Sequence, residues 1–163
     1  MDLISEQIIT INEYINSRDI NNDINKVLYN KIKDGYGNKC HELGYILKES
    51  IELIQRSIGT IQTINNQSIV SYIIKFKCKI ININNDDKID VIINNINKMG
   101  IISYYKIDKL TTLENSPILV IIPYEGIKNK KYNIGDKINI IIKSSRIKHN
   151  STQIQIIGEL NNT

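Results

Sequence analysis

The sequence predicts an α+β N-terminal domain followed by an all-β barrel of five short strands. Isoleucine accounts for 40 of the 163 residues, and this β-branched side chain favours pleated strands over helices. Residues 22–33 show the clearest apolar spacing of an amphipathic helix. After residue 87, apolar and polar side chains alternate repeatedly, which is typical of half-buried strands.

Two domains are favoured over one because a polar connector interrupts the apolar patterns at residues 82–88. A chain of 163 residues can hold two small domains, each close to the lower limit for burying a sufficient core. We therefore expect one domain over residues 1–82 and a second over residues 83–163. The composition favours a soluble, ordered protein, and we expect neither secretion nor insertion into a membrane.

The N-terminal domain is expected to begin with a strand over residues 3–15, followed by the helix. Within that helix, Leu28 and Ile32 lie on the apolar stripe and should be buried inside the domain. Asn21 or Asn22 can cap the helix, because asparagine side chains accept hydrogen bonds from the free N–H groups of the first turn.

The rest of this domain is expected to consist of a loop and further strands. Glycines mark the loop at residues 35–38, and short apolar runs follow at residues 45–47 and 51–61. A long strand is expected at residues 68–83, where apolar side chains alternate with lysines. Its apolar face holds Ile74, Phe76, Cys78 and Ile80, and its basic face holds Lys75, Lys77 and Lys79.

The C-terminal domain is expected to be an OB fold, a small five-stranded barrel that binds oligonucleotides and oligosaccharides. Five short segments of period 2 lie within about 75 residues, with turn signals between them and no convincing helical pattern. These segments are residues 88–96, 100–107, 118–122, 137–143 and 153–160.

No catalytic or metal-binding motif is found. The sequence lacks a phosphate-binding G-x-x-x-x-G-K, a G-x-G-x-x-G after a strand, an H-E-x-x-H and a cysteine pair at metal spacing. The two histidines, His41 and His149, lie in different expected domains. Cys40 and His41 are interpreted as surface-loop residues rather than as a reactive or metal-binding pair. We therefore expect no catalytic residue, no metal and no cofactor.

A basic stretch at residues 128–148 is the strongest functional signal. It holds seven Lys and Arg residues and one Asp, which is typical of a phosphate-binding surface. The alternative is a solvated surface of strand edges and loops. Tyr104 and Tyr105 should point to opposite faces of one strand, so one can stack on a base while the other enters the barrel. The candidate RNA-binding residues are Lys98, Tyr104, Tyr105, Lys128, Lys130, Lys131, Arg146 and Lys148.

Five short motifs support a family resemblance by their order and spacing. They are L-G-Y-I-L at 43–47, I-Q-R at 54–56, the alternating strand at 72–80, N-K-M-G at 97–100 and I-I-G-E-L at 156–160. In this arrangement the chain resembles the larger stalk subunit of archaeal and eukaryotic RNA polymerases, which is the seventh subunit of RNA polymerase II. The resemblance covers nearly the whole chain and implies a truncated RNP-like N-terminal domain and an S1-type OB domain.

The resemblance implies a non-catalytic subunit of a multisubunit DNA-directed RNA polymerase. Its N-terminal domain would dock on the polymerase core subunits, and its OB domain would contact single-stranded nascent RNA. A smaller stalk partner accompanies this subunit in the family. The composition, rich in Ile, Asn and Lys, resembles a version from a large DNA virus, which implies the host cytoplasm or the virion, with the nucleus as the alternative. The candidate polymerase-docking residues are Tyr36, Gly37, Gly44 and Tyr45.

The sequence departs from the family in two places. Residues 84–88 replace the Pro-Phe-x-Gly-Glu type segment that usually joins the domains. Met99, Ile102 and Val120 occupy positions where the S1 domain usually carries aromatic side chains, so electrostatics should supply most of the RNA affinity. Two alternatives stay open: a free-standing S1-type RNA-binding protein, and a structural OB module that binds protein only.

Overall fold

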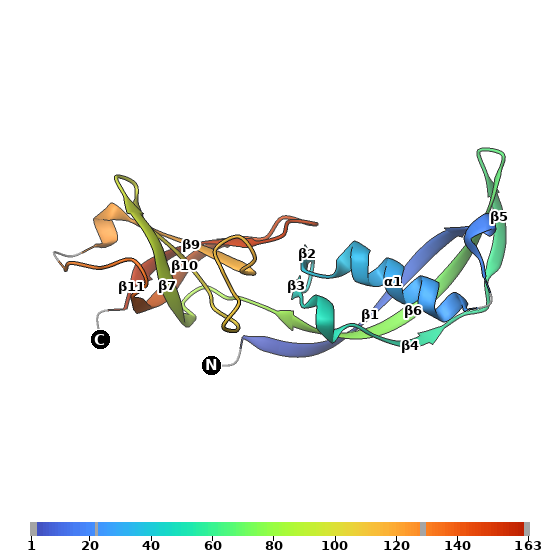
Figure 1. The fold of residues 1–163 in the computed structure, drawn as a ribbon, viewed down its shortest axis with the longest axis horizontal. Helices are drawn as coiled ribbons and strands as arrows, with labels where there is room; N and C mark the ends of the chain where they lie inside the picture. Colours follow the sequence, from blue (N-terminus) through green and yellow to red (C-terminus); the bar gives the residue numbers. More distant parts are fainter. Residues whose placement is uncertain (1–2, 22, 128–129, 162–163) are drawn as a thin grey trace. The chain divides into compact units, whose positions relative to one another are not determined.

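The computed structural model describes residues 3–21, 23–127 and 130–161, and it shows a mostly β protein with one α-helix (Figure 1). The chain divides into two compact units. The sheet unit consists of Ile4–Gly37 and Ile46–Ile80, and the barrel unit consists of Met1–Leu3, Asn38–Tyr45 and Ile81–Thr163. The expected domain boundary lies between residues 82 and 83. In the structure, residues 38–45 nevertheless group with the barrel.

The sheet unit is built around one long strand, as the alternating pattern of residues 68–83 predicts. Along β6, buried apolar side chains alternate with more exposed residues that include three lysines. Both β4 and β5 run antiparallel to β6, with Leu53 opposite Phe76 and Thr60 opposite Ser71. The strands of this unit are β1 (Ile4–Asn16), β4 (Glu52–Arg56), β5 (Thr60–Ile64) and β6 (Gln67–Ile81), and two 3-10 turns accompany them, η1 (Ser17–Asp19) and η2 (Lys48–Ser50).

Helix α1 (Ile24–Tyr36) supplies the other side of this core. Leu28 and Ile32 are both fully buried in the hydrophobic cluster, so the prediction from the apolar stripe is confirmed. The capping residue is Asp23 instead of an asparagine, because its side chain accepts a hydrogen bond from the N–H of Lys26. The helix also runs to Tyr36, so the loop expected at residues 35–38 begins later than predicted.

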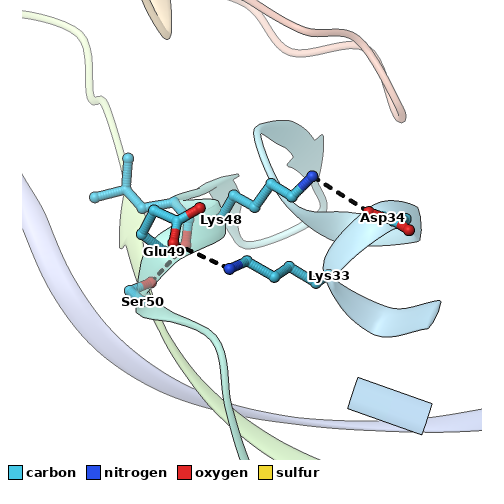
Figure 2. Close-up of polar contacts among 6 residues, drawn as sticks. Lys33, Asp34, Lys48, Glu49 and Ser50 are labelled. Atoms are coloured by element: carbon cyan, nitrogen blue, oxygen red, sulfur yellow. Dashed lines mark hydrogen bonds and ion pairs between the residues drawn. The ribbon is translucent and has the colours of Figure 1, made fainter. Parts of the chain in front are cut away.

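Two ion pairs join the last turn of α1 to η2 (Figure 2). Lys33 Nζ lies 3.0 Å from Glu49 Oε2, and Lys48 Nζ lies 3.2 Å from Asp34 Oδ1. The hydrogen bond to Glu49 raises the pKa of Lys33 above its usual value. Ser50 Oγ completes this connection by donating to the carbonyl of Leu47, at 2.6 Å. The end of the helix is therefore tied to the segment that leads into β4.

The barrel unit contains a closed barrel of five strands, which confirms the expected barrel and gives it an OB-like strand order. Around the barrel the order is β7, β8, β9, β11, β10 and back to β7. The pair β9 and β11 is parallel and the other four pairs are antiparallel. The strands are β7 (Lys88–Asn97), β8 (Gly100–Tyr104), β9 (Ile118–Pro123), β10 (Lys137–Arg146) and β11 (Ile154–Leu160), with η3 (Tyr124–Gly126) after β9.

Isoleucine and valine side chains fill the interior of this barrel. Ile101, Val120 and Ile140 are each fully buried, as the period-2 pattern requires. Gly100 adopts φ +140°, and a Cβ there would lie 1.9 Å from the carbonyl oxygen of Ile122, so only glycine fits. Strand β8 ends at Tyr104 rather than at residue 107, because the Asp108 carboxylate accepts hydrogen bonds from the following residues and forms a turn.

The barrel unit also contains β2 (Lys39–His41) and the first two residues of its neighbour β3 (Gly44–Ile46). Ile46, the last residue of β3, is grouped with the sheet unit. The N-terminal region contains a further sheet and one α-helix, and its assignment as an α+β domain stays a prediction. Its similarity to a truncated RNP fold stays a prediction.

Candidate nucleic-acid interface

The strand register aligns four side chains across the outer face of the barrel. Tyr104 on β8 lies opposite Leu119 on β9, and Leu119 lies opposite Gln155 on β11. Gln155 in turn lies opposite Arg146 on β10. Since neighbouring strands are about 4.8 Å apart, this lateral row extends for roughly 14 Å. It places an aromatic ring, an aliphatic side chain, an amide and a guanidinium group in one line.

A second, aliphatic row lies beside the lateral row. Ile102, Ile121 and Ile157 are paired across β8, β9 and β11, and none of them is buried. Ile157 is 47% exposed, although the other two outward positions of β11, Gln155 and Glu159, are polar. This part of the barrel therefore presents an apolar platform with a polar and basic margin.

The basic margin forms a recess at the turn between β10 and β11. The recess has a volume of about 190 Å³ and lies at the Arg146 end of the lateral row. Among the described residues, no carboxylate pairs with either of its two cations. It is lined by Arg146, Lys148, Ser151, Gln153 and Gln155.

Backbone hydrogen bonds hold this turn in place. The N–H of Ser151 donates to the carbonyl of Lys148 at 2.9 Å, and Asn150 adopts φ +62°, as asparagine often does in tight turns. The turn is also fixed to β2. The N–H of Cys40 donates to the carbonyl of Ser151 at 2.8 Å, and the N–H of Asn150 donates to the carbonyl of Cys40 at 3.0 Å.

Only part of the predicted RNA-binding set lies at this site. Arg146 and Lys148 both line the recess, whereas Tyr104 lies three strands away from Arg146 in the lateral row and directly opposite Ile92, where β10 begins. Lys98 is in the turn between β7 and β8. Met99, which follows it, accepts a hydrogen bond at its carbonyl from the N–H of Tyr124, at 3.3 Å. The exposed Lys130 and Lys131 lie in the segment that leads from η3 to β10, and Lys128 lies outside the described residues.

One of Tyr104 and Tyr105 was expected to enter the barrel while the other stacks on a base, but neither tyrosine points into the barrel. Both are half-buried, and Ser103 is the residue of β8 that points into the barrel beside them. Tyr105 lines a separate groove of about 1,100 Å³. In that groove four lysines are balanced by four aspartates, so it offers a polyanion no net charge. The charged residues of this groove are Lys88, Lys106, Lys109, Lys137, Asp86, Asp87, Asp90 and Asp108.

The assignment of Val120 to a base-stacking position is wrong. Val120 is fully buried inside the barrel, and its neighbours Leu119 and Ile121 point outward instead. Met99 is 73% exposed in the turn after β7, and Ile102 belongs to the aliphatic row. The aliphatic character expected of the binding face is therefore present, but different residues supply it.

The interpretation of Cys40 as a surface-loop residue is also wrong. Cys40 is buried on β2, and burial raises the pKa of its thiol to about 11, which keeps the thiol protonated and unreactive at neutral pH. The rings of His41 and His149 have their centroids 6.3 Å apart, although sequence order places them in different domains. They approach because the turn between β10 and β11 is bonded to β2.

The candidate docking residues are mostly enclosed. Gly44 is buried, and Tyr45 is 3% exposed, with its pKa raised to about 12 by burial and then by the neighbouring Cys40. Tyr36 is half-buried, with its ring centroid 5.9 Å from that of Phe76. Gly37 is buried, and a Cβ there would lie 2.4 Å from the carbonyl oxygen of Lys33. These four residues stabilise local structure, and their part in docking stays a prediction.

Sequence reasoning missed three residues of the interface: Leu119, Gln153 and Gln155. The period-2 pattern of β11 signals that Gln155 points outward. Its position opposite Arg146 depends on the register of β10 against β11, which a bulge near Ile142 shifts. No local pattern in the sequence reports that register.

Comparison with known proteins leaves the site to be interpreted from its own chemistry. The sequence matches no protein-family model, and no curated protein shows significant similarity to it. Within the part of the chain that the structure describes, no group of three or more His, Cys, Asp or Glu side chains could hold a metal ion. No α-helix in that part is long and apolar enough to cross a bilayer.

Proposed function

We propose that the protein is a non-catalytic stalk subunit of a multisubunit DNA-directed RNA polymerase, and that its barrel contacts nascent single-stranded RNA. One observation carries the RNA part of this proposal. The OB-like barrel presents the lateral row of Tyr104, Leu119, Gln155 and Arg146 beside a turn with a further unpaired lysine, Lys148. Oligonucleotide-binding OB folds use the same combination of strand face and loop between their fourth and fifth strands.

The polymerase part of the proposal rests on the family resemblance of the ordered motifs. It makes the polymerase core subunits the main partners and a smaller stalk subunit the second partner. The composition supports a large DNA virus as the source, and hence the host cytoplasm or the virion as the location. Migration of the untagged protein with the largest polymerase subunits in a native lysate tests this part. Migration of the protein separately from those subunits would contradict it.

The RNA part is tested by filter binding of the full chain to single-stranded RNA at several salt concentrations. Each neutralised phosphate should contribute a slope of roughly −0.7 to the plot of log affinity against log salt, so three contacts give about −2. Absence of binding at low salt would contradict this part of the proposal.

The exposed aliphatic row supports one second candidate, a barrel that binds protein only. Ile157 and its neighbours could pack against an apolar partner surface without any nucleic acid. The two candidates differ in the expected effect of salt, because burial of apolar surface is not weakened by salt whereas phosphate contacts are.

A further inference from the structure

We propose that the recess between β10 and β11 reads one guanine base of a bound RNA strand, with Arg146 and Gln153 as the specificity-determining residues. This inference rests on the proposed RNA-binding function and goes beyond it, because phosphate contacts alone give no base preference. Three features of the recess carry it: its size, the fixed orientation of one amide, and an unpaired guanidinium group.

The size of the recess suits a single base. Its volume of about 190 Å³ lies below the roughly 300–1,000 Å³ of pockets for drug-sized ligands. All five lining residues, from Arg146 to Gln155, carry polar side chains. The lining therefore favours a small planar group that forms hydrogen bonds at its edges.

The amide of Gln153 has one determined orientation. Its Nε2 donates to the carbonyl of Leu113 at 2.6 Å and to the carbonyl of Ser116 at 3.1 Å. Both amide hydrogens are thereby used, which assigns the other amide atom as the carbonyl oxygen. Among the described residues no donor reaches that oxygen. Gln153 is only partly buried and is one of the residues that line the recess, and the proposal assigns its side-chain oxygen as the acceptor for the base.

Arg146 supplies a complementary set of donors. Its guanidinium group carries five N–H donors in a planar fork and has no carboxylate partner among the described residues. It lies directly opposite Gln155, whose exposed amide borders the same recess. The site therefore combines a forked cation with a fixed acceptor.

Guanine matches this combination best among the four bases. Its O6 and N7 atoms accept the two parallel hydrogen bonds that arginine can donate, which is the most common specific contact of arginine with a base. Its N1–H and N2 amino groups are donors that suit the oxygen of Gln153. Adenine and cytosine would instead present an amino group where guanine presents O6, and two donors would then face each other.

The surroundings of the recess favour a strand over a free base. Tyr104 lies in the same lateral row, two strands from Gln155 and thus about 10 Å away, where the next base of a strand could stack. The hydrogen bonds between Cys40 and the turn fix the wall that carries Ser151. A recess held in place in this way loses little conformational entropy when a base binds.

The test compares RNA pentamers that differ only in the central base, UUGUU, UUAUU, UUCUU and UUUUU, by fluorescence titration with the full chain. We expect UUGUU to bind roughly tenfold more tightly than UUAUU or UUCUU. Replacement of the central guanine by 7-deazaguanine removes the N7 acceptor and should remove most of that preference. This comparison needs no protein variant, so it stands even if a substitution disturbs folding.

Arg146→Lys separates base reading from charge. Lysine keeps the positive charge but lacks the planar fork, so the guanine preference should be lost while the salt dependence stays unchanged. The matched control is Arg18→Lys, because Arg18 is an exposed arginine of the sheet unit and its replacement should preserve the preference. Two results would overturn the inference of guanine recognition but not the proposed RNA binding. They are equal affinities for all four pentamers, and a guanine preference that survives both 7-deazaguanine and Arg146→Lys. Failure of every pentamer to bind at low salt would overturn the proposed RNA binding as well.

Discussion

Four lysines of the sheet unit differ from a group of cations on the barrel in one respect, which is whether a carboxylate neutralises them. Four lysines of the sheet unit lie within 3.4 Å of a carboxylate. Among the described residues, five cations at the loops and the end of β10 in the barrel have no such partner. The four paired lysines are Lys31, Lys33, Lys48 and Lys77, and the five unpaired cations compared with them are Lys98, Lys130, Lys131 and Lys148 in loops and Arg146 at the end of β10.

This difference shows why a count of charges is a weak guide to function. A paired lysine contributes little to the field that a distant phosphate experiences, since the carboxylate cancels most of it. An unpaired cation on a turn keeps its full charge, and no internal ion pair has to break before it can contact a phosphate. The comparison therefore predicts that substitutions in the sheet unit change stability, whereas substitutions in the barrel loops change RNA binding.

The largest expected effect is on stability, in the sheet unit. Leu28→Ala should lower the free energy of unfolding by about 2–5 kcal/mol, because it leaves a cavity at a fully buried position of α1. Urea denaturation followed by circular dichroism measures this. Leu110→Ala is the matched control, since Leu110 is 82% exposed and its truncation should change the free energy little. Equal losses from the two variants would contradict the assigned core.

The sequence predicts the elements of both units well because their signals are local. Alternation along residues 88–96 and helical spacing through Leu28 and Ile32 both report which side chains face a core. The strands of the barrel follow these patterns to within a few residues, and β6 does the same in the sheet unit. The helix end at Tyr36 was missed because glycine in the last turn usually signals a stop.

The candidate site is far less predictable because it depends on contacts between distant segments. The lateral row requires three strand registers, and one slip of a single residue would turn its side chains into the barrel. Contact between residue 40 and the turn at residues 148–151 spans more than 100 positions of sequence. No periodic pattern reports such a contact, which is why Cys40 was misinterpreted and why Gln153 and Gln155 were missed.

The second prediction tests the unpaired lysines at the far end of the barrel. Lys130→Gln combined with Lys131→Gln should flatten the salt slope of RNA binding by about 1.4 if both lysines contact phosphates. The matched control is Lys33→Gln combined with Lys77→Gln, which removes two lysines of the sheet unit that are paired with Glu49 and Glu6. An unchanged slope in the first variant would leave residues 130–131 as ordinary solvated surface, and an equal change in the control would contradict the comparison between units.

The third prediction concerns the aromatic end of the lateral row. Tyr104→Ala should weaken RNA binding by less than the roughly 1–3 kcal/mol that a stacked base usually contributes, because Leu119 beside it is aliphatic. Tyr124→Ala provides the control, since Tyr124 is 65% exposed in η3 and does not belong to the row. Filter binding at one fixed salt concentration measures both variants, and a larger loss from Tyr124→Ala would move the RNA path away from the row.

The smallest expected effect concerns a paired lysine of the sheet unit. Glu49→Gln removes the carboxylate whose hydrogen bond raises the pKa of Lys33, and thermal unfolding should show only a slight decrease in Tm at neutral pH. Because the pKa of Lys33 is higher in the folded state than its ordinary 10.5, the stabilisation is complete below that value and is lost as the pH rises through the folded pKa. The difference in Tm between the wild type and Glu49→Gln should therefore shrink at strongly alkaline pH and should not change between pH 6 and pH 8. RNA binding should be the same in both proteins, and a changed salt slope in Glu49→Gln would mean that neutralised lysines also contribute to the RNA-binding surface.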